Sequence, residues 1–241
     1  MKGKLIVIEG TDCSGKETQT KLLMEEMKKE GQKVEKFSFP MYDTPTGKII
    51  GGPYLGKSYI CDGWFSEGAT NVDPKVASLY YAADRVYNIK KITDLLDNGV
   101  NVILDRYVYS NMAHQGGKLS KKESREEMYN LLSTLEFGLL NLPVPDIRIF
   151  LHLPYEGSCI LRQSRSKTEA LDQHEMSEEH LKLAETAYVE IAEKFDFKTI
   201  ECMEKDRIKA ISEISKEMIN FVGGKIINNE HQKVRWVKIK N

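Results

Sequence analysis

The chain has 241 residues, of which 41% are hydrophobic and 29% are charged, and its formal net charge at pH 7 is -1. This length and composition are typical of one large globular α/β domain whose core needs neither disulfides nor metal ions. The near-zero charge argues against a nucleic-acid partner bound through bulk attraction, although a small anion needs only a local positive pocket.

Sequence signals of secretion and of membrane insertion are missing. Residues 5–8 form the one apolar run near the start, and no run of about eighteen apolar residues occurs in the chain. The cysteines at positions 13, 61, 159 and 202 include no close pair, which excludes a sequence-local zinc ribbon and gives no disulfide framework. We therefore expect a cytoplasmic protein with no membrane association.

Short β-branched runs alternate with longer helical patterns, which is typical of βα units around a parallel sheet. Apolar runs predict strands at residues 4–9, 33–39, 101–105, 146–153 and 197–202. Apolar spacing and end signals predict helices at residues 16–30, 73–98, 121–141, 155–165, 177–195 and 206–222. No repeat or linker interrupts this pattern, so we predict one domain at residues 1–222 and a basic extension at residues 223–241.

Two segments fall outside the alternation. Residues 51–71 hold five glycines among four aromatic residues. A loop this long in a compact domain is usually functional or disordered, and the interleaved aromatics favour an ordered flap. The tail, residues 223–241, has five lysines or arginines against one glutamate. Its partial alternation of apolar and charged residues over 234–240 predicts an added edge strand, and an arm for an anionic partner is the alternative.

A glycine-rich segment directly follows the first predicted strand and opens the first predicted helix. Gly10, Gly15 and Lys16 satisfy the G-x-x-x-x-G-K spacing of a phosphate-binding loop, the P-loop. Glycines let the backbone wrap closely so that N–H groups point inward, while the helix N-terminus and the lysine add positive charge. We therefore predict ATP binding by Gly10, Thr11, Asp12, Cys13, Ser14, Gly15, Lys16, Glu17 and Thr18.

The loop departs from the usual pattern where a hydroxyl normally binds Mg²⁺. Glu17 stands at that position, and Thr18 follows one residue later. Because ATP reaches enzymes as its Mg²⁺ complex, Mg²⁺ is an expected cofactor. Its ligands would be phosphates, water and Asp105, or Glu17 acting through water.

Further along the chain, Asp105 and Arg106 stand at the carboxyl end of the third predicted strand, the edge at which open α/β sheets bind ligands. There a carboxylate can orient Mg²⁺-bound water and a guanidinium can hold a phosphate, whereas the alternative is a surface turn. Arg85 lies within a largely apolar helix. A cation at such a position is usually solvated or paired, here with Asp84 or Asp94.

Arg162, Arg165 and Lys167 place three positive charges between two predicted helices. Phosphoryl transfer needs positive charge that closes over the γ-phosphate and excludes water, since ATP is otherwise hydrolysed. An arginine-bearing lid at about residues 162–175 would do both. A basic helix end that complements its own dipole is the alternative.

In this order, the motifs resemble those of the thymidylate kinase family of P-loop nucleoside monophosphate kinases. The resemblance runs from about residue 3 to 222 and rests on residues 10–18, Phe39-Pro40, Ala83-Asp84-Arg85, Asp105-Arg106-Tyr107 with Ser110 and Gln115-Gly116, and the basic 162–167 segment. It implies a three-layer P-loop NTPase fold, an α/β fold with a five-stranded parallel sheet flanked by helices, and usually a homodimer. It also implies ATP-dependent phosphorylation of dTMP to dTDP in deoxynucleotide biosynthesis.

The resemblance further implies a role for each matching residue. Catalytic roles fall on Lys16, Asp12, Arg106, Arg162 and Arg165, with Asp12 contacting the sugar or Mg²⁺. On the acceptor nucleotide, Phe39 and Tyr81 would line the base, and Ser110, Asn111 and Gln115 would contact its edge. Arg85 and Arg106 would hold the acceptor phosphate. Asp12 would also contact the acceptor, and His114 would lie near the sugar. Because Cys13 stands where some members carry arginine, the chain resembles the subtype that takes its transition-state cation from the lid.

Two departures leave alternatives open. Met41-Tyr42 stands where many relatives place a phosphate-binding arginine, and His114 replaces an aromatic residue that often crowds the sugar. Another nucleoside monophosphate kinase, a deoxynucleoside kinase and a catalytically impaired nucleotide binder therefore remain alternatives. No Asn-Lys-x-Asp motif follows a predicted strand, which argues against a GTPase switch.

Overall fold

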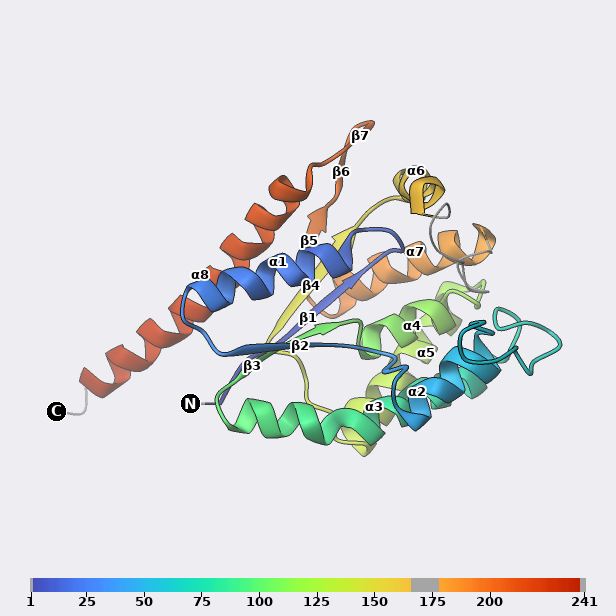
Figure 1. The fold of residues 1–241 in the computed structure, drawn as a ribbon, viewed down its shortest axis with the longest axis horizontal. Coiled ribbons are helices and arrows are strands. Elements are labelled where there is room, and N and C mark those ends of the chain that lie inside the picture. Colours follow the sequence, from blue (N-terminus) through green and yellow to red (C-terminus); the bar gives the residue numbers. More distant parts are fainter. Residues whose placement is uncertain (1, 166–177, 239–241) are drawn as a thin grey trace.

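The computed structural model describes residues 2–165 and 178–238, and the side chains of residues 2–161 and 178–226. Its centre is a five-stranded sheet in the order β2-β3-β1-β4-β5, in which each neighbouring pair is parallel. The strands are β1 (Leu5–Gly10), β2 (Val34–Ser38), β3 (Asn101–Asp105), β4 (Ile147–His152) and β5 (Lys198–Glu201). This sheet, flanked by helices, confirms the predicted α/β fold class (Figure 1).

Helices cover both faces of the sheet and make three layers (Figure 1). The longer ones are α1 (Lys16–Lys29), α3 (Pro74–Asp97), α4 (Val108–Gly116), α5 (Lys122–Ser133), α6 (Tyr155–Arg165), α7 (Glu178–Lys194) and α8 (Ile211–Lys238). Shorter elements are α2 (Pro45–Ile49), the π-helical turns η1 (Ile50–Tyr54) and η2 (Thr134–Leu139), and the hairpin strands β6 (Met203–Glu204) and β7 (Arg207–Ile208).

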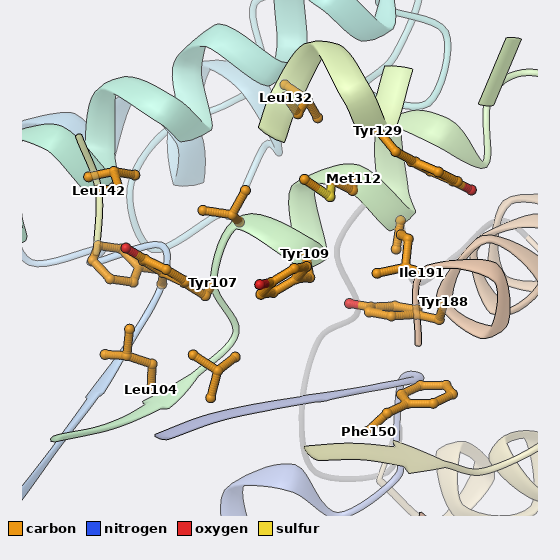
Figure 2. Close-up of a cluster of buried hydrophobic side chains, with 14 of the residues drawn as sticks. Leu104, Tyr107, Tyr109, Met112, Tyr129, Leu132, Leu142, Phe150, Tyr188 and Ile191 are labelled. Atoms are coloured by element: carbon orange, nitrogen blue, oxygen red, sulfur yellow. The ribbon is translucent and has the colours of Figure 1, made fainter. Parts of the chain in front are cut away.

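The alternation of side chains along β1 divides the core between the two faces. Leu5 and Val7 belong to a cluster built with α3, α4, α5 and α7, whereas Ile6 and Ile8 belong to a second cluster built with α1 and α8. Figure 2 shows the first cluster, in which Tyr109 and Met112 of α4 lie between β4 and the outer helices. A strand buried on both faces is apolar along most of its length, as β1 is at residues 5–8.

The predicted edge strand at residues 234–240 is wrong, since α8 continues as a helix to Lys238. The physical reason is a longer-range apolar pattern: Ile214, Met218, Val222 and Ile226 recur every four residues and all pack on the second cluster. This apolar helical face extends past Gly223 and Gly224, so the alternation of apolar and charged residues after residue 233 does not make the tail a strand. In Figure 1 the end of α8 projects beyond the sheet.

Two other boundaries are corrected. The last helix begins at Ile211 and not at residue 206, because residues 203–208 form the antiparallel hairpin β6-β7 with Lys205 in the left-handed region at its turn. The helix predicted at residues 121–141 is α-helical only to Ser133 and then widens into the η2 turn, which carries the buried Glu136. The flap at residues 51–71 packs around the buried Tyr54.

Candidate active site

The P-loop connects β1 to α1 and lies against the end of β4. Cys13 and Gly15 have positive φ angles of 61° and 79°, which turn the backbone inward in the manner of an anion-binding nest. A Cβ at Gly10 would come within 2.7 Å of the Leu151 carbonyl oxygen, so only glycine allows this approach. The Thr11 hydroxyl fixes the loop to β4 by donating to the Leu153 carbonyl at 2.7 Å.

Lys16 is the cation of the loop. Its Nζ is buried and donates to the carbonyl oxygens of Gly10 and Thr11 at 2.8 and 2.9 Å. Burial, helped by the nearby Arg106, lowers the Lys16 pKa to about 8, while Asp12 opposes the shift. The ammonium is therefore held at a site where an anion would stabilise it, as ATP phosphates would.

Asp105 ends β3 beside this loop, and Arg106 follows it. Arg106 has φ 67°; its Nη2 donates to Asp12 Oδ1 of the P-loop at 2.6 Å, and its Nη1 donates to the Tyr188 hydroxyl of α7 at 3.1 Å. Burial opposes ionisation of Asp12, but the charges of Arg106 and Lys16 outweigh it and hold the Asp12 pKa well below its ordinary value. Asp12 and Arg106 therefore form an ion pair directly beside the phosphate loop.

Glu9, the residue before the P-loop, orients the helix that follows Arg106. Its buried carboxylate accepts hydrogen bonds from the backbone N–H groups of Tyr107 and Ser110, at 2.8 and 3.1 Å, and from the Ser110 hydroxyl. It thus caps the N-terminus of α4, whose own N-cap residue Tyr107 supplies no side-chain bond. Burial raises the Glu9 pKa, although Ser110 and Arg106 oppose the shift.

Arg85 is buried in α3 and forms a bidentate ion pair with Glu136 of η2. Its Nη2 donates to Oε1 at 2.6 Å, and its Nε donates to Oε2. Asn111 of α4 donates to the same carboxylate at 3.1 Å. The expected pairing of Arg85 with Asp84 or Asp94 is wrong, because Asp84 accepts from the Met41 N–H, Thr46 and Asn88, and Asp94 pairs with Lys90.

Four buried polar atoms of the predicted site residues have no hydrogen-bond partner among the residues whose side chains are described. Both amide atoms of Gln115 and the amide oxygen of Asn111 are buried and unbonded there, as is the Ser14 hydroxyl oxygen in the P-loop. A buried polar atom without a hydrogen bond costs about 1–3 kcal/mol. Asn111 and Gln115 are therefore suited to a planar polar ligand, and Ser14 is suited to a phosphate.

One cavity of about 530 Å³ joins these parts. It is lined by the P-loop from Asp12 to Thr18, by Asp105 and Arg106, and by Phe39, Tyr81, Arg85, Ser110, Asn111, His114 and Gln115. The structure thus brings together the predicted ATP and acceptor residues. Gly10 and Thr11 lie outside the lining, and the side chains of Arg162 and Arg165, at the end of α6, lie outside the described part.

The acidic residues of the cavity fit a shared Mg²⁺ site. Asp105 and Glu17 line the cavity with Asp12, but within residues 2–165 and 178–238 no three His, Cys, Asp or Glu side chains are grouped to hold a metal by themselves. Mg²⁺ commonly binds one or two carboxylates together with substrate phosphates and water. This donor set suits an ion that arrives with ATP.

The structure adds residues that the sequence did not predict to lie in the site. Tyr42, Leu55 and Lys57 line the cavity, and the last two belong to the flap. Tyr188 of α7 holds Arg106 and Ser110, at 3.1 and 2.9 Å. No local sequence pattern predicts the role of Tyr188. Glu9 could have been found, because a glutamate directly after the apolar residues 5–8 of a buried strand needs a buried partner.

The P-loop faces the Asp12–Arg106 pair, and Asn111 and Gln115 form a second polar end of the same cavity. This arrangement is that of a P-loop phosphotransferase. The sequence profile of the family described as "Thymidylate kinase" matches residues 8–213, and the chain belongs to that family. The family is one of nucleotide kinases that use ATP, which the P-loop geometry accommodates.

Individual relatives agree with this assignment. A "Probable thymidylate kinase" of Pyrococcus abyssi is 34% identical over 77% of this chain and 84% of its own. The "Thymidylate kinase" of Schizosaccharomyces pombe is 28% identical over 92% of each chain. The solved thymidylate kinase of Candida albicans, which is described as having broad substrate specificity and a novel structural element, has a TM-score of 0.69 at 25% identity and 92% coverage of both chains. Within the described residues, no helix combines the length and apolar character needed to cross a membrane.

Proposed function

We propose that this chain transfers the terminal phosphate of ATP to the 5′-phosphate of dTMP, giving dTDP and ADP. The observation that carries the proposal is the single cavity in which the P-loop with Lys16 faces Arg106 and the acceptor-side residues Asn111 and Gln115. Family membership and the names of the relatives support dTMP as the acceptor.

The transfer is direct and in line. A phosphate oxygen of dTMP is already a competent nucleophile, so no general base is needed, and catalysis consists of positioning and charge neutralisation. In this scheme Lys16 holds the β- and γ-phosphates, Arg106 holds the acceptor phosphate, and Asp12 keeps Arg106 in place. Mg²⁺ would be held by phosphates, water and Asp105, with Glu17 acting through water. Arg162 and Arg165 would neutralise the transferring phosphoryl group from the lid.

The ion pair with Glu136 suggests a different role for Arg85 from the expected phosphate clamp. A guanidinium whose charge is already balanced by a buried carboxylate has less attraction for a phosphate but still donates hydrogen bonds. Its neighbours in the cavity, Asn111 and Gln115, carry amide groups suited to a neutral ring edge. We therefore assign Arg85 to an oxygen of the base, with Tyr81 stacked on the ring and Phe39 beside it.

The test is a panel of acceptors offered with MgATP: dTMP, dUMP, dCMP, UMP, AMP and thymidine, with ADP release as the readout. The proposal expects the highest kcat/KM for dTMP. A clear preference for another monophosphate or for thymidine would replace it with a different nucleotide kinase. Binding of ATP with no ADP released for any acceptor would indicate an impaired enzyme.

A homodimer is also part of the proposal. The outer face of α3 exposes Val76, Leu79, Val86 and Tyr87, with Leu79 57% and Tyr87 60% exposed. These positions follow helical spacing, so they form one apolar stripe of the kind that a second copy would cover. Light scattering of the purified chain should give a dimer mass, and Leu79→Lys should give a monomer.

A further inference from the structure

The flap, residues 51–71, contributes to one wall of the cavity, a position that its sequence did not predict. Its residues Leu55 and Lys57 line the cavity, while Tyr59 and Trp64 are 72% and 78% exposed. The Lys57 ammonium lies 5.3 Å from the centre of the Tyr42 ring, which also lines the cavity. The conformation of the flap therefore sets the shape and the charge of this wall.

Lys118 fastens the flap to the end of α4. It stands just beyond the helix end, three residues after Gln115, and its Nζ donates to the carbonyl oxygens of Ala69 and Val72, both at 2.9 Å. The same Nζ lies 3.2 Å from the Tyr54 hydroxyl, which itself donates to the Ala69 carbonyl at 2.9 Å. One ammonium group thus closes three contacts to a loop more than forty residues earlier in the chain.

Placing an ammonium group there has a cost that these contacts offset. Burial lowers the Lys118 pKa to about 8, and Asp73, at the start of α3, opposes the shift. An apolar side chain would avoid the desolvation cost but would leave the carbonyls of Ala69 and Val72 without this donor. The contacts to these carbonyls and to Tyr54 therefore give a physical reason for a lysine at this position.

The contacts continue from the flap to the acceptor end of the cavity. The buried Tyr54 ring meets Tyr81 edge to face, with ring centres 5.8 Å apart and an interplanar angle of 87°. It also packs against Phe65 at 6.0 Å. Because Tyr81 lines the cavity, the position of Tyr54 limits the plane that the Tyr81 ring can adopt.

We propose that Lys118 is a positioning residue that latches the flap, which carries Lys57, and through Tyr54 sets the Tyr81 ring for the acceptor nucleotide. The inference rests on the proposed dTMP site. Among the residues whose side chains are described, Lys118 is not part of the cavity lining, and its hydrogen bonds go to Tyr54, Ala69 and Val72 and not to the P-loop, so we expect its effect to fall on the acceptor and to leave ATP binding unchanged.

The experiment compares steady-state kinetics of Lys118→Met with the wild type and with Lys122→Met, a change at an exposed lysine at the start of α5. Loss of hydrogen bonds to a charged donor should raise the KM for dTMP about tenfold or more, with the KM for ATP within about twofold. Lys122→Met should leave both constants unchanged. Tyr54→Phe, which removes only the hydroxyl, should raise the KM for dTMP by a smaller factor in the same direction.

An unchanged KM for dTMP in both Lys118→Met and Tyr54→Phe would overturn the latch, as would an equal rise in the KM for ATP. If Lys118→Met does not fold, Tyr54→Phe alone decides, provided its melting temperature lies near that of the wild type. Wild-type activity separates the two proposals: a wild type inactive on dTMP refutes the function, whereas an active wild type with insensitive variants refutes only the latch.

Discussion

The ion pair between Arg85 and Glu136 gives the sharpest stability prediction. The two side chains are 2% and 0% exposed, and the carboxylate accepts two bonds from the guanidinium and a third from Asn111. Glu136→Gln keeps the shape of the side chain but leaves the Arg85 charge buried without compensation. Breaking a buried pair in this way costs about 3–5 kcal/mol. With an m-value of about 3 kcal/mol per M, the urea midpoint should fall by about 1–1.7 M.

Urea unfolding followed by circular dichroism measures this effect. Asp94→Asn is the matched control, because it breaks the exposed pair with Lys90 on the same helix and should leave the midpoint unchanged. The double variant Arg85→Met with Glu136→Leu removes both charges and should recover most of the loss. An unchanged midpoint in Glu136→Gln, or a double variant as unstable as the single one, would refute the reasoning.

Three further predictions concern activity. Arg106→Ala should lower turnover by about 10³-fold or more. Lys16→Ala and Arg162→Ala should also lower turnover far more than they lower folding stability. If Arg162→Ala keeps turnover within a few-fold of wild type, the lid assignment is wrong. Because the Lys16 pKa is lowered to about 8, its ammonium is present below that pH and lost above it, so calorimetry should find ATP affinity of the free enzyme falling as pH rises through about 8. A flat profile from pH 7 to 9.5 would contradict this. Gln115→Leu should stabilise the empty enzyme by about 1–3 kcal/mol yet raise the KM for dTMP, and thermal shifts with and without dTMP separate the two effects.

The sequence predicted the parts of the molecule whose cause is local. The P-loop follows from glycine conformations and the charge of Lys16 within a few residues, and β1 follows from its apolar run. Asp105 and Arg106 could also be placed, because carboxyl ends of parallel strands meet at one edge of the sheet. These features need no knowledge of which helix packs on which strand.

The remaining features depend on contacts between distant segments. Arg85 meets Glu136 across 51 residues, and Arg106 meets Tyr188 across 82. No periodicity in the sequence specifies such a partner, so the pairing of Arg85 with Asp84 or Asp94 was chosen from neighbours along the chain and is wrong. The tail was mispredicted for a related reason. The local alternation of apolar and charged residues predicted a strand, but the packing of Ile226 on the second core cluster, which includes Ile6 and Ile8 of β1, favours a helix.

The long-range pairs explain how the empty site tolerates its cations. Arg106 and Arg85 are each balanced by a carboxylate, Asp12 and Glu136, so neither charge is buried alone before a nucleotide binds. The two pairs differ in what happens next. Asp12 and Arg106 line the cavity together, so an acceptor phosphate can share the guanidinium with Asp12. Glu136 is fully buried and is not among the described residues that line the cavity, so we expect its pair with Arg85 to persist when a nucleotide binds and to fix the direction of the guanidinium. One arginine is thereby suited to charge neutralisation during transfer, and the other to holding a base in a single orientation.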